Sequence, residues 1–275
     1  PINVAPRLIV ENLSMCNAEG VSVLDNVNFT ANAGEILGIA GIAGSGQKEL
    51  LEAIAGLQKL DSGAITYIHP DDGGTEDLRN KSPKQIRELG VRLSFVPEDR
   101  LGMGLVGNMG IIDNMMLRSY RKGHGLFLNR STPSSLAEQI ISELQVVTPN
   151  EMTPVRRLSG GNVQKVLVGR EIAAAPTVLM AAYPVRGLDI NSSYLIYNLL
   201  NEQKEKGVSV IFVGEDLDVL IELCDRILVL SSGQVSGIVD PKATPTRANT
   251  MKEEIGLLMT SKVVNPSENH KEEQH

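Results

Sequence analysis

The stretch Leu158-Ser159-Gly160-Gly161-Asn162-Val163-Gln164-Lys165 decides the fold of this chain. A serine and two glycines stand directly before residues 163–175, which we expect to form a helix. A hydroxyl and bare N–H groups at the positive end of a helix dipole make a site for a phosphate group. A serine that merely caps a helix, with flexible glycines beside it, produces the same pattern. The rest of the chain has to separate these two interpretations.

A second glycine-rich stretch, Gly41-Ile42-Ala43-Gly44-Ser45-Gly46-Gln47-Lys48, has the G-x-x-x-x-G spacing of a phosphate-binding P-loop. Residues 34–40 before it read as a buried strand, and the apolar residues of 50–57 after it fall at helical spacing. In such a strand, loop and helix, backbone N–H groups surround phosphate oxygens. We therefore expect the nucleotide-facing residues to be Gly41, Gly44, Ser45, Gly46, Gln47 and Lys48. A lone match of this kind can also be an ordinary glycine turn.

The two residues that close this loop differ from those of a working P-loop. A working loop has a lysine that reaches the β- and γ-phosphates, followed by a serine or threonine that holds Mg²⁺. Here these residues are Gln47 and Lys48. Lys48 cannot replace the lysine, because one step along a helix turns a side chain by about 100°. Two roles stay open for Lys48: a charge that replaces Mg²⁺, or a solvated lysine on the helix face.

Short apolar runs in the second half of the chain predict a parallel sheet. Residues 177–182, 208–214 and 226–230 suit buried central strands, and residues 191–206 and 216–223 suit the helices between them. Residues 8–13 and 20–29 read as two further strands, and Gly233 marks a hairpin turn. Residues 97–157 look like an inserted helical subdomain. After residue 241 the chain is polar, apart from one amphipathic piece around Ile255, and residues 265–270 read as disordered.

Composition excludes several classes of protein. The 275 residues are 42% hydrophobic and 21% charged, which suits a globular core, and the net charge of −7 argues against a nucleic-acid partner. Cys16 and Cys224 are far apart and the four histidines have no metal-ligand spacing, so we expect no metal site and a reducing cytosol. No apolar run is long enough to span a membrane, and the start of the chain lacks a signal pattern. A first residue of proline rather than methionine suggests a processed or excised segment.

Four motifs together resemble the nucleotide-binding domains of ABC transporters. They are Pro97-Glu98-Asp99-Arg100, Leu158-Ser159-Gly160-Gly161-Asn162, Pro184-Val185-Arg186-Gly187-Leu188-Asp189 and Cys224-Asp225-Arg226-Ile227-Leu228-Val229-Leu230. The second resembles the signature sequence that defines these ATPases. The resemblance runs from about residue 8 to residue 260 and is to the C-terminal half of the duplicated ATPase subunits of bacterial importers of simple sugars and nucleosides. The Gly46-Gln47 step and residues 237–241 favour the nucleoside or basic-membrane-lipoprotein-linked branch.

The resemblance implies an α/β P-loop NTPase fold of the ABC type, with a RecA-like core, a small antiparallel β subdomain and an inserted helical subdomain. We expect residues 1–98 and 165–240 to form the core with its β subdomain. Residues 99–164 would form the helical subdomain that carries the signature, and residues 241–275 a C-terminal extension.

The resemblance also implies which catalytic positions have changed. Ala182 stands where the family has the aspartate associated with Mg²⁺, and Tyr183 where it has the glutamate general base. Glu215 replaces the switch histidine, and Glu98 replaces the glutamine that bridges nucleotide and transmembrane partner. Residues 15–17 lack the aromatic side chain that stacks on adenine, and Phe29, the first aromatic residue, reads as core. Four catalytic positions are therefore substituted while the signature is intact, namely Gln47, Ala182, Tyr183 and Glu215.

Because ABC domains pair head to tail, the resemblance implies that Leu158, Ser159, Gly160, Gly161 and Asn162 complete the ATP site of a partner half, with Asp189 near the interface. ATP and Mg²⁺ would be held by that partner, and the chain's own site would be weak or empty. The isolated chain would be inactive or nearly so, while the two halves together form the ATPase. Implied partners are the N-terminal half of the same subunit, transmembrane permeases and, indirectly, an external substrate-binding protein, at the cytoplasmic face of a bacterial membrane.

Two other classes of function stay open on sequence alone. One is a soluble ABC-class ATPase outside transport, acting on ribosomes or DNA, or a regulatory nucleotide-binding module; such proteins usually keep both pockets and are more basic. The other is a scaffold without a nucleotide role, against which the intact signature argues.

Overall fold

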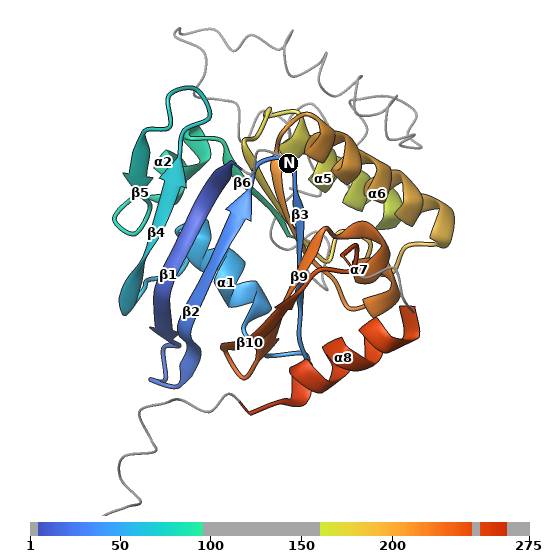
Figure 1. Cartoon of the computed structure of the whole chain (residues 1–275). Coiled ribbons are helices and arrows are strands. Elements are labelled where there is room, and N and C mark those ends of the chain that lie inside the picture. The colour runs from blue at the N-terminus through green and yellow to red at the C-terminus, as the bar shows by residue number, and fades with distance from the viewer. Residues whose placement is uncertain (1–4, 96–159, 244–247, 263–275) are drawn as a thin grey trace, which may run out of the picture. The chain divides into compact units, whose positions relative to one another are not determined.

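A computed structural model describes residues 5–95, 160–243 and 248–262 (Figure 1). The chain divides into two compact units. The first unit contains Pro1–Ala5, Ala33–Ile36 and Ser82–Phe212, and the second contains Pro6–Asn32, Leu37–Lys81 and Val213–His275. Among the described residues, no helix has the length and apolar character needed to cross a membrane.

The second unit contains an antiparallel sheet of four strands in the order β2-β1-β4-β5. These strands are β1 (Pro6–Cys16), β2 (Ser22–Asn32), β4 (Ser62–Ile68) and β5 (Thr75–Asp77). Along β1 the residues Leu8 and Val10 are buried, because alternate side chains of a strand point to the same face. The alternation shifts register between Val10 and Leu13, where Asn12 has a positive φ, as expected of a β-bulge. This sheet is the small antiparallel β subdomain that the resemblance implied.

The second unit also holds the strand and helix that flank the glycine loop. Its other elements are β3 (Ile36–Ala40), of which Ile36 lies in the first unit, α1 (Gln47–Ile54), α7 (Leu217–Leu223), β9 (Arg226–Ser231), β10 (Gln234–Val239) and α8 (Ala248–Thr260). Strand β3 is buried along its whole length and runs parallel to β9. Strand β10 pairs antiparallel with β9 through a turn at Gly233, whose φ of 80° suits glycine.

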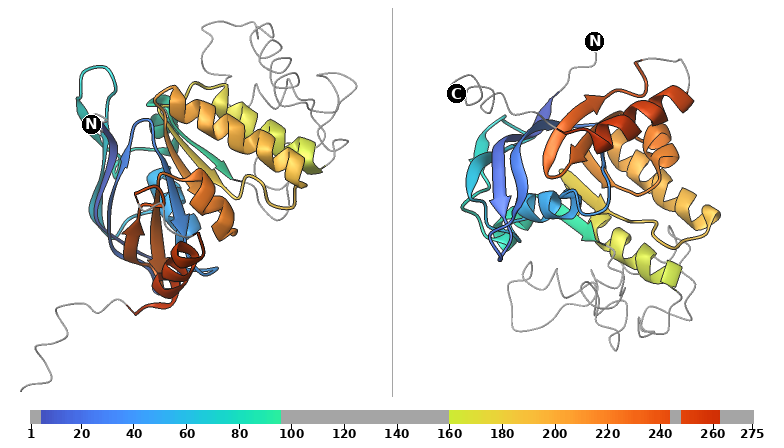
Figure 2. Two further views of the ribbon diagram at one scale, coloured as in Figure 1. Left: turned by 45° about the vertical axis from the view of Figure 1, so that its right-hand side comes forward. Right: turned by 90° about the horizontal axis from the view of Figure 1, so that it is seen from below.

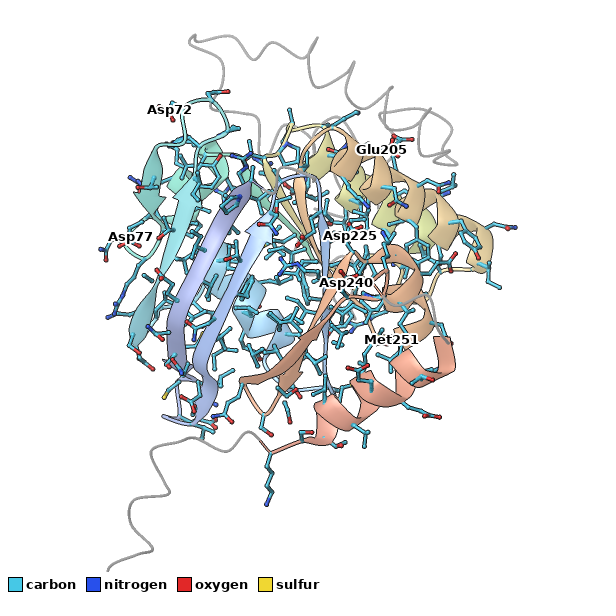
Figure 3. All side chains as sticks on the ribbon, in the orientation of Figure 1. Asp72, Asp77, Glu205, Asp225, Asp240 and Met251 are labelled. Carbon is cyan, nitrogen blue, oxygen red and sulfur yellow. The ribbon has the colours of Figure 1, made fainter. Side chains whose placement is uncertain are left out.

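Helix α8 is attached to the β9–β10 hairpin by hydrogen bonds. The hydroxyl of Ser236 donates to the carbonyl of Leu258 at 2.7 Å, and that of Ser231 donates to the carbonyl of Ser261 at 2.8 Å. Beyond β10, Asp240 accepts the backbone N–H groups of Lys242 and Ala243 (Figure 3).

The first unit contains three neighbouring strands in the order β8-β7-β6, covered by helices. The strands are β6 (Val91–Phe95), β7 (Val178–Ala182) and β8 (Ser209–Val213), of which Val213 lies in the second unit. The helices are α2 (Pro83–Glu88), α5 (Gly160–Ile172) and α6 (Ile190–Glu205). β6 and β7 are parallel, with Phe95 beside Ala182. Helices α5 and α6 run side by side (Figure 2). The ring of Tyr197 on α6 meets that of Phe212 on β8 at 6.3 Å.

The sequence expectations for this architecture are largely confirmed. Strands β7, β8 and β9 and helices α6 and α7 lie within one or two residues of the expected ranges, and β9 and β7 have parallel neighbours. Strand β1 extends beyond the expected range at both ends, whereas β2 begins at Ser22, later than expected, and continues past Phe29 to Asn32. Irregularities in the pairing of β1 with β2 let the strands continue past breaks in the apolar pattern. Phe29 is buried, as expected.

Two helix expectations need correction. Helix α1 ends at Ile54, so Leu57, expected on its apolar face, lies outside the helix and is 55% exposed. Helix α5 occupies 160–172 rather than 163–175, so two glycines of the signature form its first turn. The expected helical subdomain at 97–157 and the expected disorder at 265–270 lie outside the described residues.

Candidate functional site

The glycine loop connects β3 to α1 within the second unit. Ile42, Ala43 and Gly44 are exposed, and the loop is closed by a hydrogen bond from the N–H of Ser45 to the carbonyl of Ile42 at 3.0 Å. Gly233 donates its N–H to the carbonyl of Ser45, which attaches the loop to the β9–β10 turn. These contacts fix the path of the loop between β3 and α1.

Gly46 stands immediately before α1 and needs to be glycine for two reasons. Its φ is 102°, in the left-handed region, and a Cβ there would lie 2.8 Å from Leu24 Cδ2 and 3.0 Å from the carbonyl of Val23. No side chain caps the helix at this end. The first N–H groups of α1 are therefore not blocked by a cap, as in a helix that binds an anion at its start.

Gln47 fills the inside of the loop. Its side chain is buried, with 5% exposed, and its Nε2 donates to the carbonyl of Ile42 at 3.0 Å. A Cβ on Gly41 would lie 2.6 Å from the same Nε2, which shows how closely the amide lies against the loop. The side chain at this position is thus neutral and directed at the loop's own backbone.

Lys48 lies on the outer face of α1. Its side chain is 45% exposed, and its Nζ is 3.5 Å from Glu52 Oε1, one helical turn further on. This geometry favours the second role considered for Lys48, a lysine on the helix face, because the ammonium group is directed along α1.

Glu215 lies in the second unit, shortly after the end of β8, and its side chain is exposed. The next residue, Asp216, caps α7 by accepting the N–H groups of Asp218 at 2.9 Å and Val219 at 3.4 Å. An ionised glutamate cannot donate a hydrogen bond to a phosphate, and its charge repels one.

In the first unit, Ala182 and Tyr183 stand at the end of β7. Ala182 is buried, whereas Tyr183 is partly buried with a φ of 53°, which is uncommon for an aromatic residue. The guanidinium of Arg186 lies 3.9 Å from the centre of the Tyr183 ring, a cation–π contact. Neither residue at the strand end carries a carboxylate.

The side chains at the expected magnesium positions do not fit that ion. Mg²⁺ prefers oxygen ligands, and neither Lys48 nor Ala182 has a side-chain oxygen. Within residues 5–95, 160–243 and 248–262 there is also no group of three or more His, Cys, Asp or Glu side chains placed to hold a metal ion.

Asp189 begins helix α6. Its Oδ1 accepts the backbone N–H of Ser192 at 3.0 Å, and its Oδ2 accepts the hydroxyl of the same residue at 2.8 Å. The hydrogen bond from the Ser192 backbone, and next that from its hydroxyl, hold the pKa of Asp189 below its usual value. Asp189 is therefore an exposed anion with a structural role as N-cap.

The signature sequence is only partly within the described residues. Leu158 and Ser159 lie outside them, as does Glu98, while Gly160, Gly161 and Asn162 form the first turn of α5. The backbone N–H groups of a first helical turn have no partner within the helix. The two glycines thus lie in the turn whose N–H groups have no partner within the helix.

Gln164, one turn into α5, is a residue to which the sequence assigned no role. It is fully buried, and its Nε2 donates to the carbonyls of Arg186 at 2.8 Å and Pro184 at 3.3 Å. The contact spans about twenty residues of sequence and has no periodic signal, so only the folded chain reveals it.

The region expected near adenine also has no aromatic side chain. Met15 is buried in β1, and Cys16 is exposed, with its N–H bound to Asp61 Oδ2 at 2.7 Å. A hydrogen bond to Asp61 raises the pKa of the Cys16 thiol. Residues 15–17 therefore offer no stacking surface for a base.

Comparison with known proteins assigns this chain to one family. Residues 24–184 match the ABC transporter family. The guanosine import ATP-binding protein NupO of Bacillus subtilis (strain 168) is 36% identical over 258 residues, covering 93% of this chain and 48% of that protein. The glucose import ATP-binding protein TsgD13 of Haloferax volcanii is 38% identical over 260 residues, covering 93% and 45%. This chain therefore spans about half the length of the curated relatives it matches.

Solved structures agree on the fold. The crystal structure of a nucleotide-free ATP-binding cassette from an ABC transporter superposes with a TM-score of 0.75 at 20% identity, covering 94% of this chain and all of that one.

Proposed function

This chain belongs to the ABC transporter family, and from that premise we propose that it is a nucleotide-binding domain that completes a partner's ATP site without hydrolysing ATP at its own. The transported class that the relatives suggest is a simple sugar or a nucleoside, because the two relatives above are named for glucose and guanosine import.

The observation that carries this proposal is the position of Gln47. A lysine there would bring a positive charge to the β- and γ-phosphates, but the amide is neutral and its donor is already used by the carbonyl of Ile42. Binding a triphosphate in this loop would lack that charge and would require the amide to leave its partner. Weak or no nucleotide binding is the expected result.

The end of β7 supports the loss of hydrolysis independently. A general base typically accelerates a reaction by about 10²- to 10⁴-fold. At the position of that base stands Tyr183, and the residue before it, Ala182, has no side-chain oxygen for a metal ion. Attack of water on a bound phosphate would therefore lack both its base and its metal ligand.

The proposed contribution to the partner's site comes from α5. In the family each ATP lies between the P-loop of one half and the signature of the other. The N–H groups of Gly160 and Gly161 at the positive end of α5, with the Ser159 hydroxyl and Asn162, would bind and orient the γ-phosphate held by the partner. Asp189 would lie near the same interface.

The proposed setting follows from the same assignment. The first partner is the N-terminal half of the same subunit, which supplies the P-loop, the base and the magnesium ligands. Permease subunits, and through them an external substrate-binding protein, complete the transporter at the cytoplasmic face of the membrane. We place the helical subdomain that contacts the permease at residues 99–164, between core segments 1–98 and 165–240.

The test is a charge and size change at the signature. Ser159→Arg, made in the chain paired with its N-terminal half, should abolish ATP hydrolysis coupled to transport, because arginine fills the phosphate site. Ser22→Arg, at an exposed position at the start of β2, is the matched control and should leave hydrolysis unchanged. Normal turnover in Ser159→Arg would refute the proposal.

A second experiment addresses the chain's own site. The purified chain alone should release no phosphate from ATP above background in a steady-state assay. Turnover of ordinary magnitude, about 1 per second or more, would show that the loop is catalytically competent.

A further inference from the structure

Residues 183–189, which connect β7 to α6 in the first unit, are held by side-chain contacts. Gln164 on α5 binds the backbone of the segment, and within the segment Arg186 stacks on Tyr183. Asp189 at its end is bound to Ser192 on α6. The segment is therefore connected to both neighbouring helices.

The Gln164 amide can adopt only one orientation. Both groups in front of its Nε2 are carbonyl oxygens, those of Pro184 and Arg186, so a flipped amide would place oxygen against oxygen. In the orientation found, Gln164 Oε1 is buried and has no hydrogen-bond partner among the residues that the structure describes. An unpaired buried acceptor is unfavourable for folding. The contribution of this side chain thus comes from its donor, which holds the segment.

Tyr183 contributes its aromatic face to this arrangement. Its ring receives the Arg186 guanidinium at 3.9 Å, and its carbonyl accepts the N–H of Arg186 at 3.1 Å. The left-handed backbone of Tyr183 turns the chain at the point where β7 ends. A partly buried cation–π contact is of the same size as a good hydrogen bond.

We propose that Gln164 and Tyr183 are positioning residues that hold residues 184–188 against α5, so that the signature glycines and Asp189 meet the partner's nucleotide as one rigid body. This proposal deepens the function proposed above and rests on it for its consequence, but the rigid connection itself is a property of this chain. It gives Tyr183 a role beyond the loss of a general base.

The physical basis is the path of contacts. Gly160 and Gly161 lie one turn before Gln164 on the same helix, so a shift of that turn moves the amide with it. Through its two hydrogen bonds the amide moves the carbonyls of Pro184 and Arg186. The end of the segment then moves Asp189, which begins α6.

The first test measures amide hydrogen exchange in the chain alone. The N–H groups of Arg186 and Leu188 bond within the segment, to the carbonyls of Tyr183 and Val185. Gln164→Met keeps the length and burial of the side chain but removes the donor. Exchange at Arg186 and Leu188 should become about tenfold faster, the size expected from losing one or two hydrogen bonds.

Ser209→Ala is the matched control, because it also removes a buried oxygen without a partner in the same unit. It should leave exchange at Arg186 and Leu188 unchanged. Equal exchange in Gln164→Met and the parent chain would overturn the proposal.

Tyr183 provides a second pair of variants, which leaves helix α5 unchanged and so tests the proposal even if Gln164→Met disturbs the folding of that helix. Tyr183→Phe keeps the aromatic face and should retain slow exchange at Arg186, whereas Tyr183→Leu removes the face and should accelerate it several-fold. If leucine protects Arg186 as well as phenylalanine does, the stacking has no positioning role.

The consequence for the partner is measured in the complex with the N-terminal half. Gln164→Met and Tyr183→Leu should lower kcat several-fold with little change in KM for ATP, and Tyr183→Phe should restore it, since the partner's own loop still binds ATP. Faster amide exchange at Arg186 and Leu188 together with an unchanged kcat would refute the rigid-body coupling. Ser159→Arg in the same assay tests the proposed function separately, so the two failures are distinguishable.

Discussion

At the scale of single residues, Gln47 separates the shape of a phosphate loop from its charge. The backbone of the loop has Gly46 in the left-handed region and an uncapped helix behind it, features that anion sites at helix starts share. The amide inside it is neutral and bound to Ile42. A substitution at position 47 can therefore change the charge inside the loop without changing the shape of the loop backbone.

Gln47→Lys should restore nucleotide binding without restoring hydrolysis. A charge-assisted contact to phosphate contributes about 1.5–3 kcal/mol, so the Kd for ATP should fall at least about tenfold. Titration with labelled ATP measures the binding, and phosphate release measures the reaction. Gln47→Met, which removes the amide without adding charge, is the control and should bind ATP weakly. Rapid phosphate release by Gln47→Lys would mean that Ala182 and Tyr183 do not limit the reaction.

Asp189 predicts a pH dependence of stability. Hydrogen bonds from Ser192 lower its pKa in the folded chain, so the folded state favours the carboxylate more than the unfolded state does. The stabilisation is complete above the unfolded pKa of about 4 and is lost as pH falls through the lower folded pKa. Asp189→Asn keeps an N-cap but does not titrate. Its urea midpoint should fall less than that of the parent between about pH 5 and pH 2; parallel curves would contradict this.

At the scale of elements, the contact between β3 and α7 limits what the strand before the loop can carry. A Cβ on Gly38 would lie 2.6 Å from Cys224 Sγ and 3.0 Å from Leu220 Cδ2. Gly38→Ala should therefore lower the free energy of unfolding by about 1–3 kcal/mol, as overpacking does. Urea unfolding measures the loss. In a Cys224→Ala background, Gly38→Ala should lower the free energy of unfolding by a smaller amount. Equal losses of unfolding free energy in both backgrounds would exclude this steric explanation.

A buried ion pair connects β6 with α5. Glu171 is fully buried, with its Oε2 at 2.7 Å from Arg92 Nε and its Oε1 at 3.2 Å from Arg170 Nε. Glu171→Ala should lower the free energy of unfolding by about 3–5 kcal/mol, because the guanidinium groups of Arg92 and Arg170 lose the buried carboxylate that neutralises them. The control is Glu88→Ala, which removes the exposed pair with Lys84 and should cost at most about 1 kcal/mol. Similar unfolding midpoints for both variants would contradict the prediction.

At the scale of the whole molecule, nucleotide should stabilise the assembly rather than this chain alone. A ligand raises the melting temperature only of a state that binds it, by an amount set by its concentration relative to Kd. ATP with Mg²⁺ should therefore leave the Tm of the chain by itself almost unchanged and raise the Tm of the chain paired with its N-terminal half by several degrees. Differential scanning fluorimetry makes the comparison. A large shift for the chain alone would show that its own loop binds ATP firmly.

Local pattern predicts the elements that are long or uniformly apolar. Strands β7, β8 and β9 are continuous apolar runs, and α6 and α7 have clear starts at Asp189 and Asp216. The region from β4 to β6 was not predicted, because its strands are short and of mixed polarity. Ile65 and Tyr67 in β4 and the apolar–polar alternation of residues 91–95 in β6 show the two-residue period that could have identified these two strands.

What the sequence by itself determined is the chemistry available at each position. The Gln47 side chain has no charge, that of Ala182 no oxygen and that of Tyr183 no carboxylate in any fold, since these are properties of the side chains. Tertiary structure alone decided where those groups point and what they hold. Gln47 donates into its own loop, Arg186 stacks on Tyr183, and Gln164 binds the carbonyls of Pro184 and Arg186. The last contact joins residues about twenty positions apart through backbone carbonyls, which every residue possesses, and so leaves no mark in the sequence.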